Sequence, residues 1–244
     1  MRSTFSRANN TMASRSLIET AVKAGVRNFI FSSTATVYAG ESSDLLTETL
    51  PTGPISPYGR SKLMTEWMLE DSARAYDFRY VALRYFNVAG ADAKGRTGQS
   101  SPRATHLIKR ACQVALGRVP QLDIFGTDYP TADGTGVRDY IHVSDLVAAH
   151  GLALDYLRRG GAAEVMNCGY GHGSSVREVI ASVERVTGRK LPVREAPRRP
   201  GDPPWLIADS KRIRATLGWS PRHDDLDEIV RTAYAWESRL NSAG

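Results

Sequence analysis

Tyr58 and Lys62 lie four residues apart in the stretch SPYGRSKLMTEW, residues 56–67, at the start of a predicted helix. Residues at this spacing share a helix face with Cβ atoms about 5 to 6 Å apart, so the ammonium group should lie near the phenol. A free tyrosine titrates at about 10, and a neighbouring cation favours its phenolate. The pair therefore predicts a tyrosine that can act as a general base or acid. The same spacing is also typical of a surface tyrosine packed over a lysine stem.

Hydroxyl side chains follow the predicted strand that precedes this helix. The run RNFIFSS, residues 27–33, is short, apolar and rich in Phe and Ile, which is typical of a buried strand. Ligands bind at the carboxyl ends of strands in open α/β sheets. At this end the sequence supplies the hydroxyls of Ser32, Ser33, Thr34 and Thr36.

Segments whose apolar residues follow a helical period alternate along the chain with segments typical of strands, which predicts an α/β protein with a parallel sheet. Further strands are expected at 79–91 and 163–169. On the helix that begins at Tyr58, Leu63, Met64, Trp67 and Met68 share one face, which predicts an amphipathic helix. Other helices are expected at 10–24, near 105–117, after Ser144, and at 174–188 and 224–240.

Composition limits the classes of function. The 244 residues are 41% hydrophobic and 24% charged, and no apolar run approaches the roughly 18 residues of a membrane span. We expect a soluble, cytoplasmic protein without a membrane partner. The formal charge of +6 suits an anionic substrate, and no nucleic-acid-binding motif accompanies it. Cys112 and Cys168 are expected to be free thiols, and the separated histidines predict no metal site.

Six stretches, in order through nearly the whole chain, resemble the UDP-glucose 4-epimerase family of the extended short-chain dehydrogenase/reductase superfamily. They are NFIFSSTATVY, PTGPISPYGRSKLMTE, LRYFNVAGA, IFGTDYPTADGTGVRDYIHVSDL, VMNCGYGHGSSVREVI and RRPGD. The resemblance implies a Rossmann-like, doubly wound parallel sheet with a smaller C-terminal α/β lobe that binds the UDP-sugar. The Rossmann part would span 1–92 and the lobe mainly 93–244, with segments near 139–168 returning to the sheet.

The resemblance also implies an activity, which is the interconversion of UDP-glucose and UDP-galactose. NAD would take hydride from C4 of the sugar and return it to the opposite face of a 4-keto intermediate. Tyr58 would take the proton of the 4-hydroxyl, Lys62 would lower the pKa of Tyr58 and hold the nicotinamide ribose, and Thr34 would bind the reacting oxygen. The helices at 10–24 and 58–76 would pair in a homodimer.

Binding residues follow from the same resemblance. Phe125 would contact uracil, Asn87 would hold the diphosphate or the sugar, and Arg138 and Arg199 would bind negative charge and ribose. The cofactor-binding residues would be Asn9, Asn10, Ser32, Ser33, Tyr58, Lys62 and Tyr85. The substrate-binding residues would be Thr34, Asn87, His106, Phe125, Arg138, Tyr140, Arg199, Asp202 and Leu206.

Two features depart from that family. A dinucleotide loop of the form G-x-x-G-x-x-G is absent, and the late cluster CGYGHGSS at 168–175 matches a substrate-side loop instead. We therefore expect a chain that begins inside a Rossmann domain, binds NAD poorly, and is inactive or prone to aggregation. Leu206 lies where a bulky aromatic tends to exclude N-acetyl sugars, which leaves UDP-N-acetylglucosamine open as a substrate.

Two other functions stay open at the level of the sequence. The chain could be a non-catalytic remnant that binds nucleotide sugars, although such a protein would not need Tyr58, Lys62 and Thr34. It could also be another NAD-dependent nucleotide-sugar epimerase or a dehydratase. Dehydratases place an acidic pair after the threonine, and Ala35 and Thr36 follow Thr34 here, so dehydration is disfavoured.

Overall fold

The computed structural model describes residues 7–38, 45–101 and 105–240. Its internal contacts divide the chain into two compact units. The first unit combines the residues up to Phe86 with Ala148–Cys168 and Ala208–Ser220. The second unit combines Asn87–Val147, Gly169–Ile207 and the residues from Pro221 on. The expected ranges differ from this division, because the first boundary falls at Phe86 rather than at residue 92 and 208–220 lies in the first unit.

The first unit contains a parallel three-stranded sheet in the order β1-β2-β7. Its strands are β1 (Asn28–Ser32), β2 (Arg79–Tyr85) and β7 (Glu164–Cys168). Residues 80–84 of β2 are all buried, as expected for a central strand with both faces covered. Because the strands are parallel, their carboxyl ends lie at one edge of the sheet. The predicted α/β architecture with a parallel sheet is confirmed.

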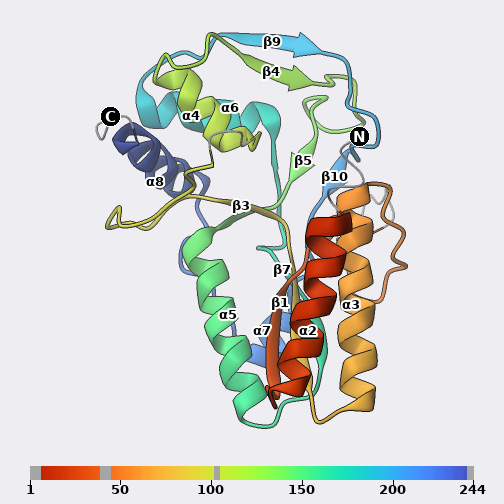
Figure 1. The fold of residues 1–244 in the computed structure, drawn as a ribbon. Helices are drawn as coiled ribbons and strands as arrows, with labels where there is room; N and C mark the ends of the chain where they lie inside the picture. The colour runs from red at the N-terminus through yellow and green to blue at the C-terminus, as the bar shows by residue number, and fades with distance from the viewer. Residues whose placement is uncertain (1–6, 39–44, 102–104, 241–244) are drawn as a thin grey trace. The chain divides into compact units, whose positions relative to one another are not determined.

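Helices cover the sheet of the first unit. Figure 1 shows α2 and α3 side by side along it, with α5 and α7 on its other side. Between α2, α3 and the sheet lies a core of Ile18, Phe31, Leu69, Phe78, Tyr80 and Ala82. The helical segments are the π-helix η1 (Arg7–Met12), α2 (Ala13–Lys23), the 3-10 turn η2 (Ala35–Val37), α3 (Pro57–Ala75), α5 (Val143–Arg158) and α7 (Lys211–Leu217).

Local sequence signals explain where α3 begins. Ser56 is its N-cap and accepts a hydrogen bond from the Gly59 backbone N–H at 3.0 Å, and Pro57 occupies the first helical turn. The helix thus starts one residue before the predicted Tyr58, which lies in its first turn. The predicted apolar face is only partly buried, because Leu63 is buried while Met64 and Trp67 are 37% and 53% exposed.

The second unit is built from short strands. β3 pairs with β6, β4 pairs with β9, and β5 lies between β10 and β8. The strands are β3 (Asn87–Ala89), β4 (Leu122–Phe125), β5 (Val137–Arg138), β6 (Tyr140–His142), β8 (Ser174–Ser175), β9 (Val193–Ala196) and β10 (Trp205–Leu206). The single strand predicted at 79–91 is therefore wrong, because the chain passes from β2 of one unit to β3 of the other at Phe86.

Three helices pack together in the second unit, namely α4 (Leu107–Ala115), α6 (Val176–Thr187) and α8 (Leu226–Arg239). α6 begins with a capping box of Ser175 with Glu178 and is followed by Gly188 in the left-handed conformation, at φ 67°. A buried ion pair joins α4 to α8, with Lys109 Nζ 2.6 Å from Glu237 Oε2.

Three further observations concern membranes, metals and thiols. Among the described residues, no helix has the length and apolar character that crossing a bilayer requires. Within the same ranges, no group of three or more His, Cys, Asp or Glu residues could hold a metal ion. Cys112 and Cys168 are both buried, and neither forms a disulfide with another described residue.

Candidate functional site

The phenol of Tyr58 is hydrogen-bonded to the side chain of Thr34 in the first unit. Thr34 is the N-cap of η2, the turn that follows β1, and its Oγ1 accepts from the Thr36 backbone N–H at 3.2 Å. The same oxygen lies 3.1 Å from Thr36 Oγ1. The structure thus brings the first turn of α3 and the carboxyl end of β1 together at these two oxygens.

Lys62 lies one helical turn after Tyr58. Its Nζ donates to the backbone oxygen of Ser32 at 2.9 Å and lies 4.8 Å and 5.9 Å from the ring centroids of Phe31 and Tyr58. Within the described ranges no carboxylate pairs with this ammonium group. Lys62 therefore presents a cation at the edge of the sheet whose charge no protein anion in these ranges neutralises.

The pKa of Tyr58 corrects one prediction. Burial raises this pKa above its ordinary value, although 42% of the residue is exposed. The neighbouring Tyr85 raises it further, and the hydrogen bond with Thr34 opposes both effects. The predicted lowering by Lys62 is not found, because the ammonium group donates to Ser32 rather than to the phenol. Burial also lowers the pKa of Lys62.

Other predicted cofactor residues divide into two groups. Tyr85, at the end of β2, is hydrogen-bonded to the side chain of Ser32, so both lie at the same sheet edge as Lys62. Asn10 Nδ2 donates to Ser61 Oγ at 3.0 Å, which places it against the first turns of α3. Ser33, by contrast, is fully buried and donates its hydroxyl to Glu66. Asn9 lies outside the residues whose side chains the structure describes.

His150 of α5 was not predicted, yet its Nε2 lies 3.2 Å from Ser32 Oγ. It extends the row of polar groups at the carboxyl ends of β1 and β2. Its sequence position gives no signal of this contact, because it lies 118 residues from Ser32 and belongs to a helix with its own apolar pattern.

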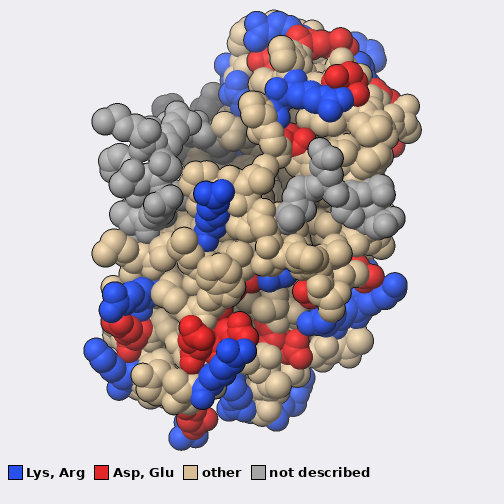
Figure 2. Space-filling view, turned by 90° about the vertical axis from the view of Figure 1, so that its right-hand side faces the viewer, with Lys and Arg blue, Asp and Glu red and all other residues tan. Residues whose placement is uncertain are grey.

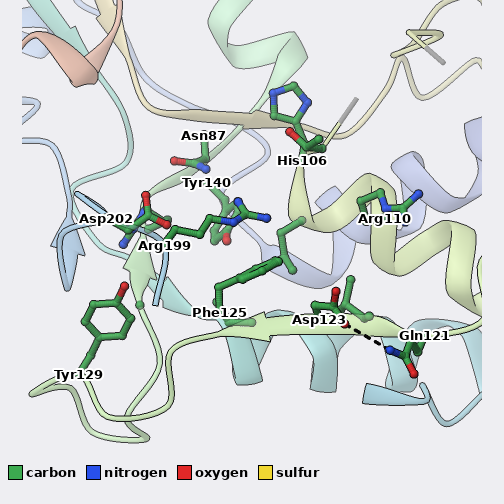
Figure 3. Close-up of a pocket in the computed structure, with 16 residues that line it drawn as sticks. Asn87, His106, Arg110, Gln121, Asp123, Phe125, Tyr129, Tyr140, Arg199 and Asp202 are labelled. Atoms are coloured by element: carbon green, nitrogen blue, oxygen red, sulfur yellow. Dashed lines mark hydrogen bonds between the residues drawn. The ribbon is translucent and has the colours of Figure 1, made fainter. Parts of the chain in front are cut away.

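A pocket of about 630 Å³ lies within the second unit. Ligand pockets commonly have about 300–1,000 Å³, so the volume suits a nucleotide-sized molecule. Seven of the nine predicted substrate residues line this pocket, namely Asn87, His106, Phe125, Arg138, Tyr140, Arg199 and Asp202. Figure 3 shows Asn87, Tyr140 and Arg199 on the side of the pocket that faces Phe125.

The remaining two predicted substrate residues do not line the pocket. Thr34 belongs to the first unit and contacts Tyr58 there. Leu206 lies on β10 beside Arg138 of β5 in the parallel register of these strands. The pocket also contains residues that the sequence interpretation missed, among them Arg110, Gln121, Asp123 and Tyr129. Arg110 could have been found, because it follows His106 by one helical turn at the start of α4.

The lining combines aromatic rings with cations. The guanidinium carbon of Arg199 lies 3.8 Å from the ring centroid of Phe125, and Arg138 Nη1 donates to the Val137 backbone oxygen at 2.9 Å. Planar guanidinium groups pair with phosphate oxygens, and aromatic rings stack on bases. The pocket therefore has the groups that bind a nucleoside diphosphate.

Comparisons with known proteins agree with this chemistry. The model of the NAD dependent epimerase/dehydratase family matches residues 3–169. A UDP-glucose 4-epimerase of Azospirillum brasilense is 59% identical over 235 residues, which cover 96% of this chain and 68% of that protein.

Two solved structures are also similar. One is the UDP-glucose 4-epimerase of Stenotrophomonas maltophila with bound NAD and formylated UDP-arabinopyranose, which is 41% identical with a TM-score of 0.92. The match covers 96% of this chain and 70% of that chain. The UDP-Glc/GlcNAc 4-epimerase of Campylobacter jejuni is 49% identical with a TM-score of 0.81 and covers 96% of this chain and 71% of its own. The chain belongs to the NAD dependent epimerase/dehydratase family.

Proposed function

We propose that this chain is a UDP-glucose 4-epimerase that interconverts UDP-glucose and UDP-galactose with NAD as its cofactor. The observation that carries the proposal is the contact of Tyr58 with Thr34 at the carboxyl end of β1, with the Lys62 ammonium one helical turn away. The 59% identity to an enzyme of this name supports it.

The groups around Lys62 fit the ribose and nicotinamide end of NAD. A cation that no carboxylate neutralises among the described residues, together with the hydroxyls of Ser32, Tyr58 and Tyr85, offers donors and acceptors for ribose hydroxyls. Lys62 and Tyr58 would hold the ribose, and Asn10 would contact the cofactor from η1, just before α2. When bound, NAD supplies the exchange of hydride at C4 of the sugar.

Tyr58 and Thr34 would handle the proton of the 4-hydroxyl. The phenol must be ionised to accept this proton, and burial opposes ionisation by raising its pKa. The hydrogen bond of Thr34 opposes this rise, and Lys62, whose Nζ lies 5.9 Å from the centroid of the Tyr58 ring, would have to leave the Ser32 backbone oxygen to stabilise the phenolate further. The hydroxyl of Thr34 would hold the phenol and the sugar oxygen in line during transfer. Tyr58 would later return the same proton to the sugar.

The second unit would bind the UDP part of the substrate. Phe125 would stack on uracil, Arg138 and Arg199 would bind the diphosphate, and Asn87 would bind the diphosphate or the sugar. His106, Tyr140 and Asp202 line the same pocket and would contact the nucleotide. With leucine rather than a bulky aromatic at position 206, UDP-N-acetylglucosamine stays a candidate substrate.

One observation favours a second candidate function, the binding of nucleotide sugars without turnover. The pocket is lined by the second unit alone, so its residues could bind UDP independently of Tyr58 and Lys62. Dehydration is not favoured, because the side chains of Ala35 and Thr36 after Thr34 cannot donate or accept a proton as a carboxyl group does.

We also infer a homodimer that pairs α2 and α3. Met12, Leu17, Met64 and Trp67 of this region are exposed apolar side chains, and such groups mark contact surfaces when they lie together. Figure 2 shows that charged side chains are sparse in the middle of the face that includes α3 and that side chains of both signs gather in its lower part. A cytoplasmic location stays a prediction from the sequence.

The test uses the purified 244-residue chain with UDP-galactose and NAD. UDP-glucose is measured with a coupled UDP-glucose dehydrogenase, and UDP binding is measured separately by calorimetry. We expect turnover that Tyr58→Phe abolishes while UDP binding is kept. Binding of UDP without turnover would favour the non-catalytic function, and loss of both would contradict the proposal.

A further inference from the structure

Glu66 and Arg84 form a buried ion pair in the first unit. Glu66 Oε1 accepts from Arg84 Nε at 3.0 Å and Oε2 accepts from Nη2 at 2.6 Å, and the side chains are only 5% and 7% exposed. Desolvation of a buried pair offsets most of its attraction, so such a pair adds little net stability. The paired donors and acceptors do, however, fix the relative position of the two side chains closely.

This ion pair holds both ends of the segment that carries Thr34. Ser33, immediately before Thr34, donates its hydroxyl to Glu66. Tyr38, immediately after the turn η2, accepts at its phenol oxygen from Arg84 Nη1 at 3.1 Å. The residues on either side of 34–37 are therefore fixed to the same pair, although they lie on opposite ends of the turn.

The contacts continue into the sheet. The phenol of Tyr38 donates to Asn167 Oδ1 at 2.7 Å, and Asn167 Nδ2 donates to the Leu46 backbone oxygen at 2.7 Å. Asn167 is fully buried on β7, the strand that pairs with the strand of Arg84. We call Ser33, Tyr38, Glu66, Arg84 and Asn167 the Glu66–Arg84 network. Because Arg84 and Asn167 lie on two paired strands and Glu66 lies on α3, the network can hold Ser33 and Tyr38, and with them the turn, rigidly.

The helix of Tyr58 belongs to the same arrangement. Glu66 lies on α3, two turns after Tyr58 and one turn after Lys62. Next to Tyr58, a Cβ at Gly59 would overlap the backbone oxygen of Thr36, so the first turn of α3 packs directly on the Thr34 segment. The network thus connects the helix that carries the phenol to the turn that carries its hydrogen-bonding hydroxyl.

We propose that Glu66 and Arg84 are positioning residues, which hold Ser33 and Tyr38 and thereby keep the Thr34 hydroxyl against the phenol of Tyr58. The meaning of this contact for catalysis rests on the proposed function, whereas the contact itself can be measured without turnover. The network touches neither Tyr58 nor Lys62 through a side-chain hydrogen bond that the structure describes, so it acts through the backbone on either side of Thr34.

The experiment removes one hydroxyl at each end of the turn and leaves the ion pair intact. Ser33→Ala removes the hydroxyl before the turn and Tyr38→Phe removes the one after it. The double variant removes both and so detaches both ends of the turn from the ion pair. The readout is the pKa of Tyr58 by ¹³C NMR on the chain labelled at tyrosine Cζ, with the resonance assigned from Tyr58→Phe. Thr34, Lys62 and Tyr85 are the groups that face Tyr58, and the variants replace none of them.

We expect the pKa of Tyr58 to rise by roughly half a unit in each single variant and further in the double variant, because Thr34 then hydrogen-bonds the phenolate less well. If the chain turns over substrate, kcat should fall about tenfold with KM for UDP-galactose unchanged. If the chain does not turn over, the NMR titration still decides the inference.

Ser182→Ala is the matched control. Ser182 is also fully buried and donates its hydroxyl to a carboxylate, Asp227, at 2.5 Å, and Arg185 binds that carboxylate in turn. We expect a similar fall in Tm and no change in the pKa of Tyr58. If Ser33→Ala and Tyr38→Phe lower Tm as Ser182→Ala does and leave the pKa of Tyr58 unchanged, the network is only structural. If one of them fails to fold, the other decides by the same criterion.

Discussion

The guanidinium group of Arg199 lies over the ring of Phe125, with 3.8 Å between the guanidinium carbon and the ring centroid (Figure 3). A cation in this position is attracted by the electrons of the ring face. Uracil would need a face of the same ring for stacking, so in the proposed function the base either displaces Arg199 or takes the other face. Base stacking and diphosphate binding would therefore depend on neighbouring groups in one pocket.

Phe125→Leu tests the stacking. Leucine keeps an apolar side chain but has no flat face, and stacking of a base on an aromatic ring contributes about 1–3 kcal/mol. We expect the Kd for UDP to rise at least about tenfold in calorimetry. Arg74→Ala, which removes an exposed pair with Glu70, is the control and should leave this Kd unchanged. An unchanged affinity in Phe125→Leu would remove Phe125 from the proposed site.

Arg199→Lys tests the diphosphate contact. Lysine keeps the charge but loses the planar pair of donors that matches phosphate oxygens. We expect the Kd for UDP to rise about tenfold and the Kd for uridine, which has no phosphate, to change less than about twofold. Equal losses for the two ligands would indicate that Arg199 acts on the base rather than on the diphosphate.

His142 predicts a pH dependence of stability. It is fully buried and stacks on His223 with 4.6 Å between ring centroids. Burial lowers the pKa of His142 and the charge of His223 lowers it further, while Asp145 and Glu228 oppose this shift. The unfolded chain therefore binds a proton at His142 more readily than the folded chain does. The contribution of neutral His142 to the free energy of unfolding is complete above about pH 6.5 and is lost as the pH falls through the folded-state pKa.

We expect the free energy of unfolding in urea to fall between pH 8 and pH 5.5, with His142 contributing at most about 1.4 kcal/mol per pH unit. His142→Gln keeps a polar side chain beside Thr232 and cannot titrate, so this dependence should become shallower even if the variant is less stable overall. An identical slope in the variant and the parent would assign the effect to other groups.

Lys109→Met tests the ion pair between α4 and α8. Lys109 Nζ donates to Glu237 Oε2 at 2.6 Å and to the Gln99 backbone oxygen at 3.0 Å. Removing one partner of a buried pair leaves an uncompensated charge, so we expect a loss of about 3 kcal/mol in the free energy of unfolding. The exposed pair of Arg74 with Glu70 should contribute less than about 1 kcal/mol. If Lys109→Met also lost less than about 1 kcal/mol, Gln113 and Arg118, which also contact Glu237, would be sufficient to stabilise the buried carboxylate.

The local parts of the candidate site could be predicted from the sequence. The hydroxyls after β1, the start of α3 at Pro57 and the caps of α6 follow from short-range rules, since strand period, cap chemistry and helix spacing involve neighbours in the chain. The seven predicted residues that line the pocket came from the resemblance, because no spacing rule connects Asn87 to Arg199.

Other features depended on contacts between distant segments. The strand predicted at 79–91 looked continuous because its apolar pattern is continuous, yet the chain changes units at Phe86. Met64 and Trp67 share an apolar face with Leu63, but only packing decided that they stay exposed. Ser33 looked equivalent to Ser32 and Thr34, and its side chain points to Glu66 because alternate residues of an extended segment face opposite sides.

The sequence by itself determined the α/β class, the family resemblance and the helix that places Tyr58 one turn before Lys62. These depend on periodicity, capping and order along the chain, which are local or one-dimensional properties. Only the tertiary structure decided that Lys62 donates to Ser32, that the pKa of Tyr58 is raised, and that Glu66 and Arg84 hold both ends of the Thr34 segment. Burial and hydrogen bonding across strands set these properties, and neither can be read from residues that are neighbours in sequence.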